Sequence, residues 1–264
     1  MCCLANFCAL FDKEYLVYRF YRILYYLCQM KYLFFFLFPL FIAQGQNQIE
    51  HQSQIWYGYY LSHSLTNQWY VQGEVHTRHF IDPLVHHQNA FRAHLHRTIG
   101  ENWDLSAGVA IFLNTPNDPQ TLIRLAIPEY RPHFDVVYKH SWSKVRIDHR
   151  FRSEMRFNRE TNVSRTELSD AVNFSNYRLR YRIQALFPLI KQIQGKVNTE
   201  ILLNAGQENP ANTLDQHRMF AGLSIPIHAN LTADIGYLHA FQQRSNLNYY
   251  DRSILSIMVY HRIP

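Results

Sequence analysis

The sequence predicts an all-β fold, an antiparallel transmembrane β-barrel of about 10–12 strands whose polar interior is lined by arginine and carboxylate side chains. Three observations predict it. From Gln54 onward, segments of about ten residues alternate between apolar and polar side chains, as strands do when their two faces meet different environments. Short and long connections between these segments also alternate along the chain. The polar faces are rich in Arg and poor in Lys.

The composition is that of a folded chain long enough for a sizeable domain. Of 264 residues, 47% are hydrophobic and 15% are aromatic, and there are 26 Lys and Arg against 20 Asp and Glu. These values exclude a disordered chain, a collagen-like repeat and a small disulfide-rich protein. A mean hydropathy of −0.28 argues against a helical membrane protein, which would carry several apolar runs of about 20 residues.

A secretory signal peptide is predicted at residues 30–45. An apolar run at residues 33–43 follows Lys31, and small side chains stand at Ala43 and Gly45, where a signal peptidase would cleave. The run is too short for a comfortable membrane-spanning helix, which needs about 17–25 residues. The chain is therefore expected to be exported to the cell outer membrane.

The segment before the signal peptide differs from the rest of the chain. Residues 1–29 contain all four cysteines and end immediately before Met30, so we interpret them as an over-extended gene start. The remaining residues, 46–264, are the predicted outer-membrane barrel domain. The alternative is an N-terminal membrane anchor over residues 23–42, interrupted by one lysine.

The first four predicted strands have clear apolar faces. Each places aromatic and aliphatic side chains on one face and polar or small side chains on the other. The apolar faces consist of Ile55, Tyr57, Tyr59 and Leu61; Trp69, Val71 and Val75; Phe91, Ala93 and Leu95; and Leu105, Ala107, Val109 and Ile111.

Four middle strands alternate more sharply, and three weaker ones follow near residues 217–226, 230–242 and 251–262. These make eleven segments, but bacterial single-chain barrels have an even number of strands, so we expect about 10 or 12. The polar faces of the middle strands consist of Glu129, Arg131, His133, Asp135 and Lys139; Asp148, Arg150, Arg152, Glu154 and Arg156; Arg178, Arg180, Arg182 and Gln184; and Lys196, Asn198, Glu200 and Asn204.

The connections and tryptophans fit a membrane barrel. Trp69, Trp103 and Trp142 stand at short connections, as expected of aromatic residues at a water–lipid boundary. A secreted β-sandwich or a lipocalin-like barrel would alternate in the same way. The membrane barrel is favoured because only four lysines follow residue 45, and guanidinium groups suit a confined network of ion pairs better than an open surface.

Several motifs resemble a known family. They are Trp56, then Glu129-x-Arg131-Pro132, then Asp148-His149-Arg150-x-Arg152-x-Glu154-x-Arg156, then Arg178-x-Arg180-Tyr181-Arg182, and the ending Val259-Tyr260-His261-Arg262-Ile263. In this order they resemble the domain-of-unknown-function 2490 family, uncharacterised outer-membrane barrel proteins of Gram-negative bacteria. The resemblance covers essentially residues 46–264. It implies an outer-membrane location and no established activity.

The predicted site is a network of charged side chains inside the barrel. One interpretation is a constriction that favours anionic solutes or holds an anionic ligand. The other, favoured because acidic and basic residues are interleaved, is a set of ion pairs that keeps a narrow interior filled. The predicted residues are Glu129, Arg131, Asp135, Asp148, Arg150, Arg152, Glu154, Arg156, Arg178, Arg180, Arg182 and Glu200.

No catalytic, metal or cofactor site is predicted. His94 and His96 share a face, but no cysteine accompanies them in the barrel domain and no H-E-x-x-H pattern occurs. Dipeptides such as Ser62-His63 and His140-Ser141 arise by chance. We therefore expect a structural barrel or a narrow passive pore, with a lipid-modifying hydrolase acting at the barrel rim as the alternative.

The expected partners follow from the location. They are outer-membrane lipid, lipopolysaccharide phosphates at the outer rim, and the barrel-insertion machinery, which would recognise the final strand at residues 257–263. Nucleic acid is not expected despite a pI near 9.1, because the positive charge is spread over alternate strand positions rather than gathered on one helix or arm. The barrel is expected to be monomeric.

Overall fold

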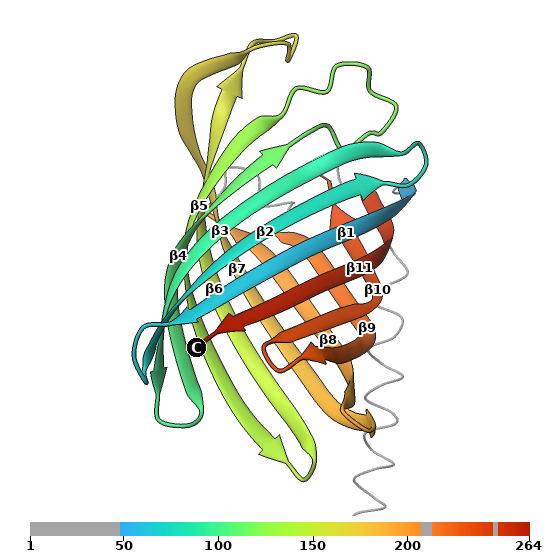
Figure 1. Cartoon of the computed structure of the whole chain (residues 1–264). Coiled ribbons are helices and arrows are strands. Elements are labelled where there is room, and N and C mark those ends of the chain that lie inside the picture. The colour runs from blue at the N-terminus through green and yellow to red at the C-terminus, as the bar shows by residue number, and fades with distance from the viewer. Residues whose placement is uncertain (1–47, 207–212, 245–247) are drawn as a thin grey trace, which may run out of the picture. The chain divides into compact units, whose positions relative to one another are not determined.

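The computed structural model describes residues 48–206, 213–244 and 248–264, which form one closed β-barrel. The predicted gene extension at 1–29 and the signal peptide at 30–45 lie outside the described residues. Within the described ranges, no helix is long and apolar enough to cross a membrane. The strands are β1 (Ile49–Ser64), β2 (Trp69–Phe80), β3 (Val85–Ile99), β4 (Trp103–Asn114), β5 (Ile127–Trp142), β6 (Val145–Thr161), β7 (Leu168–Ile190), β8 (Ile193–Ala205), β9 (Leu214–His228), β10 (Leu231–Gln243) and β11 (Tyr249–Ile263) (Figure 1).

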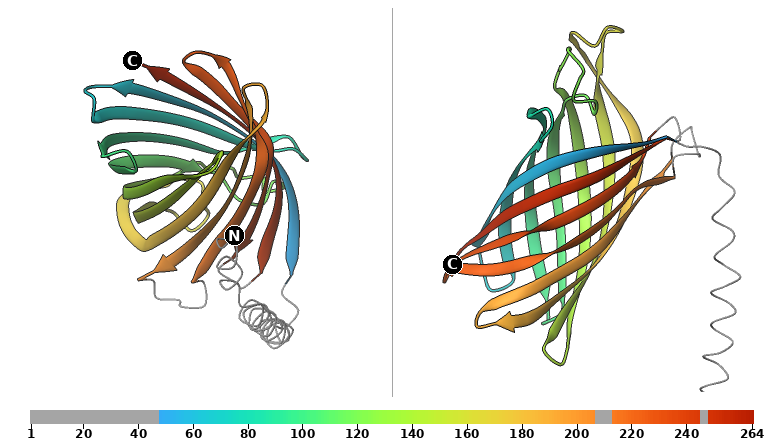
Figure 2. Two further views of the ribbon diagram at one scale, coloured as in Figure 1. Left: turned by 90° about the horizontal axis from the view of Figure 1, so that it is seen from below. Right: turned by 90° about the vertical axis from the view of Figure 1, so that its right-hand side faces the viewer.

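Each strand pairs with its neighbours in sequence, and β1 closes the ring against β11 (Figure 2). Consecutive strands are antiparallel, whereas β1 and β11 are parallel, from Ile49 opposite Tyr249 to His63 opposite Ile263. The expected even number of strands is therefore wrong for the described residues, which form eleven. An odd number makes the first and last strands run in the same direction, so the closing pair must be parallel.

The closed ring confirms the all-β barrel and excludes the two-sheet sandwich, and the strand faces follow the predicted alternation. Val109 is 57% exposed on the outer surface, and Phe134 and Phe151 are also exposed there. The intervening Asp135 and Arg152 are buried inside the barrel. Period-two alternation in a closed sheet sends every second side chain inward, and the burial of Asp135 and Arg152 shows that the charged face is the inner one.

The two ends of the barrel differ. The connections after β1, β3, β5, β7 and β9 are short turns at one end, and Trp69, Trp103 and Trp142 lie beside them. Because β11 runs parallel to β1, its last residues also lie at this end. The longest connections lie at the other end, although β2 and β3 are joined there by residues 81–84 alone. At this end β6 and β7 continue as a two-stranded hairpin up to the pair Thr161 and Leu168 (Figure 1). This hairpin leaves only residues 162–167 as the connection between β6 and β7.

Candidate functional site

The charged pairs inside the barrel begin on β5 and β6. Asp135 and Arg152 are direct partners in the register of these strands. Arg152 Nε donates to Asp135 Oδ1 at 2.5 Å, and its Nη2 donates to Oδ2 at 2.6 Å. On β5 itself, Arg131 Nε and Nη2 donate to the two oxygens of Glu129 at 2.9 and 2.7 Å. Both contacts are bidentate, the geometry that a guanidinium fork forms with a carboxylate.

Glu154 connects these pairs. It accepts a hydrogen bond from Arg180 Nη1 at 2.7 Å, and nitrogens of Arg131 and Arg152 each lie 3.8 Å from its oxygens. The carboxylate is buried and carries three neighbouring arginines, which compensate for the loss of its hydration. Glu154 thus joins the pairs of β5 and β6 to β7.

Glu200 on β8 extends the network. Its Oε1 accepts from Arg150 Nη2 at 2.6 Å and from Arg180 Nη2 at 2.9 Å, so Arg180 bridges Glu154 and Glu200. Arg156 also donates to Glu129. Nine of the twelve predicted residues therefore form one continuous network across β5, β6, β7 and β8: Glu129, Arg131, Asp135, Arg150, Arg152, Glu154, Arg156, Arg180 and Glu200.

The other three predicted residues lie in the interior but outside this network. Asp148 contacts Arg146 at 3.1 Å and Gln184 at 3.2 Å. Arg178 pairs at 2.9 Å with Asp215, which lies two strands away on β9. Arg182 forms no ion pair within the described part of the chain, and its Nε has no hydrogen-bond partner there. The position of a residue on a polar face therefore predicted that its side chain points inward, but not which residue it contacts.

Further charged residues that the sequence did not place at the site line the same interior. They include Glu74 and Arg78 on β2, Arg92 on β3, Asp215 and Arg218 on β9, and Arg252 on β11. The signal for them was present, because each lies on the polar face of its strand. The C-terminal strands alternate less regularly, since apolar Phe220 on β9 and Ile254 on β11 also point inward, as Leu202 does on β8, and this obscured the charges on β9 and β11.

Two cavities occupy the interior, one toward each end. The turn-side cavity, of about 550 Å³, reaches Tyr70 and Arg262 near the short turns. The loop-side cavity, of about 660 Å³, reaches Thr115 and Asn117 in the connection between β4 and β5. Five residues line both cavities and form the layer between them: Trp56, Arg78, Arg92, Arg180 and Arg218.

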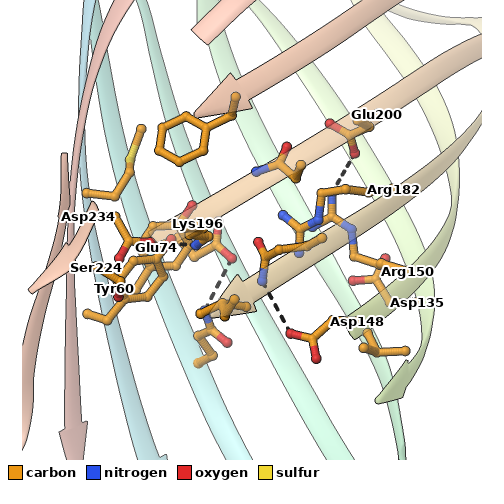
Figure 3. A pocket seen from close by; sticks show the side chains of 18 of the residues that line it. Tyr60, Glu74, Asp135, Asp148, Arg150, Arg182, Lys196, Glu200, Ser224 and Asp234 are labelled. Carbon is orange, nitrogen blue, oxygen red and sulfur yellow. Dashed lines mark hydrogen bonds and ion pairs between the residues drawn. The ribbon is translucent and has the colours of Figure 1, made fainter. Parts of the chain in front are cut away.

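Both cavities have an excess of positive charge. Eleven Lys and Arg side chains and six carboxylates line the turn-side cavity, where Arg150, Arg182, Lys196 and Glu200 surround the open volume (Figure 3). Ten arginines and only three carboxylates line the loop-side cavity. The interleaving seen in the sequence therefore does not produce electrical neutrality, and the excess is larger toward the long loops.

Arginines also stack on the two aromatic side chains near the layer. Arg78 Cζ lies 3.8 Å from the ring centroid of Trp56, and Arg218 Cζ lies 5.4 Å from it. Arg131 lies 3.6 Å over Phe112. Cation–π contacts hold these guanidinium groups in place while leaving their N–H groups available for other partners.

One group of side chains has the composition of a metal site. His94, His133 and Asp135 are buried, with one potential ligand atom from each within 4.8 Å of the others. His94 Nδ1 lies 3.0 Å from His133 Nε2, however, and both oxygens of Asp135 accept from Arg152. A metal ion would have to displace these contacts, so the arrangement fits a hydrogen-bonded cluster better than a cation site. The other histidine singled out in the sequence, His96, contacts Asp104 at 2.8 Å.

The fold and its interior define a closed β-barrel with an apolar outer surface and a positively charged, ion-paired interior. A family model described as "Protein of unknown function (DUF2490)" matches residues 53–251, and the chain belongs to this family. This confirms the resemblance found in the sequence motifs.

A search of curated proteins found no match. Among solved structures, the chain is similar to a NanC porin in a rhombohedral crystal form, with 12% identity and a TM-score of 0.49, over 80% of this chain and 99% of the porin.

Proposed function

We propose that this protein is a monomeric outer-membrane β-barrel that acts as a narrow passive pore for small anionic solutes. The outer surface supports the location. Large apolar side chains such as Val109, Phe151 and Tyr181 are exposed along the middle of the strands, which hydrocarbon tails would cover. Trp69, Trp103 and Trp142 at the turn end would lie at the water–lipid boundary.

The main support for a pore comes from the two cavities inside the barrel. They extend toward opposite ends of the barrel and share the same five lining residues, so only one layer of side chains lies between them. A barrel filled throughout by ion pairs would have no such volumes. The network around Glu154 and Glu200 then stiffens the wall, and the remaining cations face the path.

The excess of positive charge supports a preference for anions. Charged side chains that line a pore attract ions of opposite sign and repel ions of the same sign. Arg182 is well placed to contribute, because it lines the turn-side cavity and forms no ion pair with any described residue. Arg152 and Arg180 are engaged by carboxylates, so their substitution would disturb the fold as well as the selectivity.

Planar bilayers test the pore directly. The purified barrel should conduct, and its reversal potential in a KCl gradient should indicate a preference for chloride. Arg182→Gln should reduce this preference without loss of the folded barrel, whereas Arg97→Gln should leave it unchanged, since Arg97 is exposed on the outer face of β3. Absence of conductance, or a preference for potassium, would contradict the proposal.

Cell fractionation tests the location. The folded protein should be recovered with the outer membrane and should migrate faster on a gel when it is not heated, because a closed barrel resists unfolding by detergent. Recovery in a soluble secreted fraction would refute the location and, with it, the pore.

A further inference from the structure

Arg78 differs from the other arginines of the central layer in having no carboxylate partner. Its side chain is buried, with 9% of the residue exposed, and it lines both cavities. Its Nε has no hydrogen-bond partner, and it forms no ion pair with any residue that the structure describes. Its one strong contact is the stack on Trp56, 3.8 Å from the ring centroid.

Other arginines lie near Arg78 and add to the positive charge around it. The charges of Arg218, Arg92, Arg131 and Arg252 all act on it. Two of these are neutralised, because Arg92 contacts Glu74 at 2.6 Å and Arg131 contacts Glu129.

Arg252 and Arg218 are not neutralised to the same degree. Arg252 Nε donates to Gln52 Oε1 at 2.8 Å and its Nη2 donates to Asn117 Oδ1 at 3.1 Å, both of them neutral acceptors. Arg218 Nε donates to the neutral Gln216, and its nearest carboxylate oxygen, on Glu200, lies 3.7 Å away.

A buried charge without an opposite charge is costly to the fold, and a cation–π contact offsets only part of this cost. An anion in the loop-side cavity would offset more of it, since Arg78, Arg218 and Arg252 all line that cavity. Guanidinium groups bind carboxylate and phosphate oxygens through pairs of parallel hydrogen bonds. A cavity of about 660 Å³ is within the usual size range of small-molecule sites.

We propose that Arg78, Arg218 and Arg252 form a binding site for a small solute that carries at least two negative charges as carboxylate or phosphate groups. Two charges are required because Arg78 and Arg252 each lack a carboxylate partner among the described residues, and both face the same cavity. The site rests on the proposed pore for the entry of its ligand, and Arg78 is its selectivity-determining residue in the layer between the cavities.

Trp56 provides an optical readout of this site. The other three tryptophans, Trp69, Trp103 and Trp142, are exposed at the turn end, so replacing each by Phe leaves Trp56 as the single reporter beside Arg78. This variant in detergent micelles is titrated with citrate, inorganic phosphate or chloride at constant ionic strength. Citrate or phosphate should change the emission with saturation, and chloride should not. The two oxyanions separate a carboxylate ligand from a phosphate ligand.

Substitution of Arg78 tests its role. Arg78→Gln should weaken binding about tenfold or more, the loss expected for a charge-assisted contact. Arg78→Lys keeps the positive charge but loses the planar guanidinium group, so its affinity should lie between those of the parent and Arg78→Gln. Arg97→Gln on the outer face should bind as the parent does. Equal affinity of Arg78→Gln and the parent would overturn the proposal.

Calorimetric titration of the unmodified protein with the same solutes covers the case in which the single-tryptophan variant does not fold. If neither citrate nor phosphate binds with saturation, the site is refuted. Because binding in micelles needs no conduction, the two proposals fail separately. Saturable binding without bilayer conductance would support the binding site and refute the pore. Conductance without saturable binding would support the pore and refute the binding site.

Discussion

Arg152 on β6 and Asp135 on β5 face each other across adjacent strands and share two parallel hydrogen bonds of 2.5 and 2.6 Å. Both side chains are buried, and Asp135 also accepts from Ser106 Oγ at 3.3 Å. The register of the sheet fixes this pair, since a shift by one residue would turn one of the two partners to the outside. The pair therefore reports directly on correct closure of the barrel.

Removing one partner of this pair should destabilise the barrel more than replacing both partners. Asp135→Ala should destabilise the barrel by about 3–5 kcal/mol, because it leaves the Arg152 guanidinium buried without its partner. The double variant Asp135→Ala with Arg152→Met should lose less than Asp135→Ala alone. Urea unfolding in lipid vesicles measures both.

The exposed pair of Arg159 and Asp170, 3.0 Å apart on the β6–β7 hairpin, is the matched control. Removing Asp170 should cost about 0–1 kcal/mol, as exposed ion pairs do. Equal losses at the buried and exposed pairs would show that the interior of the barrel is fully hydrated.

A charge on the outer surface should be tolerated in water but not in a membrane. Val109 lies at the middle of β4 and is 57% exposed. If lipid covers it, Val109→Arg should reduce folding stability by about 2–4 kcal/mol in vesicles. Leu65→Arg, in a turn at the barrel end, should cost about 0–1 kcal/mol because it lies near the interface. A cost near zero at Val109 would argue for a soluble barrel.

Two glycines face each other on β9 and β10 and permit close packing of Phe220. A Cβ atom on Gly236 would lie 2.4 Å from the carbonyl oxygen of Ala221 and 2.6 Å from Gly222 Cα. Gly236→Ala should therefore destabilise the barrel by about 1–3 kcal/mol through overpacking. Gly73→Ala is the control, since its Cβ would meet nothing within 4 Å. In thermal unfolding, Gly236→Ala should have a lower midpoint temperature than the parent protein, and Gly73→Ala should have an equal or higher one.

The connection between β4 and β5 borders the loop-side cavity through Thr115 and Asn117. Arg124 holds it, since its Nη2 donates to the carbonyl of His86 at 2.8 Å and to Thr115 at 3.1 Å. Arg124→Ala should loosen this connection and produce a larger and noisier single-channel current. Glu167→Ala at the exposed hairpin tip should leave the current unchanged. An unaltered current in Arg124→Ala would mean that the connection does not border the path.

The histidines and the weaker C-terminal strands show what the alternation within one strand can predict and what it cannot. Alternation placed His94 on an inward face, and the structure adds its contact with His133, a residue 39 positions further along the chain. Likewise, the pair of Arg178 and Asp215 joins β7 to β9 across β8. Such contacts depend on barrel curvature and on the register of several strands, which single-strand patterns do not contain.

The sequence alone predicted the fold class, the two faces of every strong strand and the inward orientation of the predicted charges. A period of two separates the faces, and the scarcity of lysine on the arginine-rich face favoured placing that face in the confined interior. Tertiary structure decided how many strands close the ring, which charges pair, and that Trp56 and Arg78 lie in the layer between two cavities. These features depend on distances across the barrel. Those distances follow from the number and tilt of the strands and from the bulk of side chains contributed by distant parts of the chain.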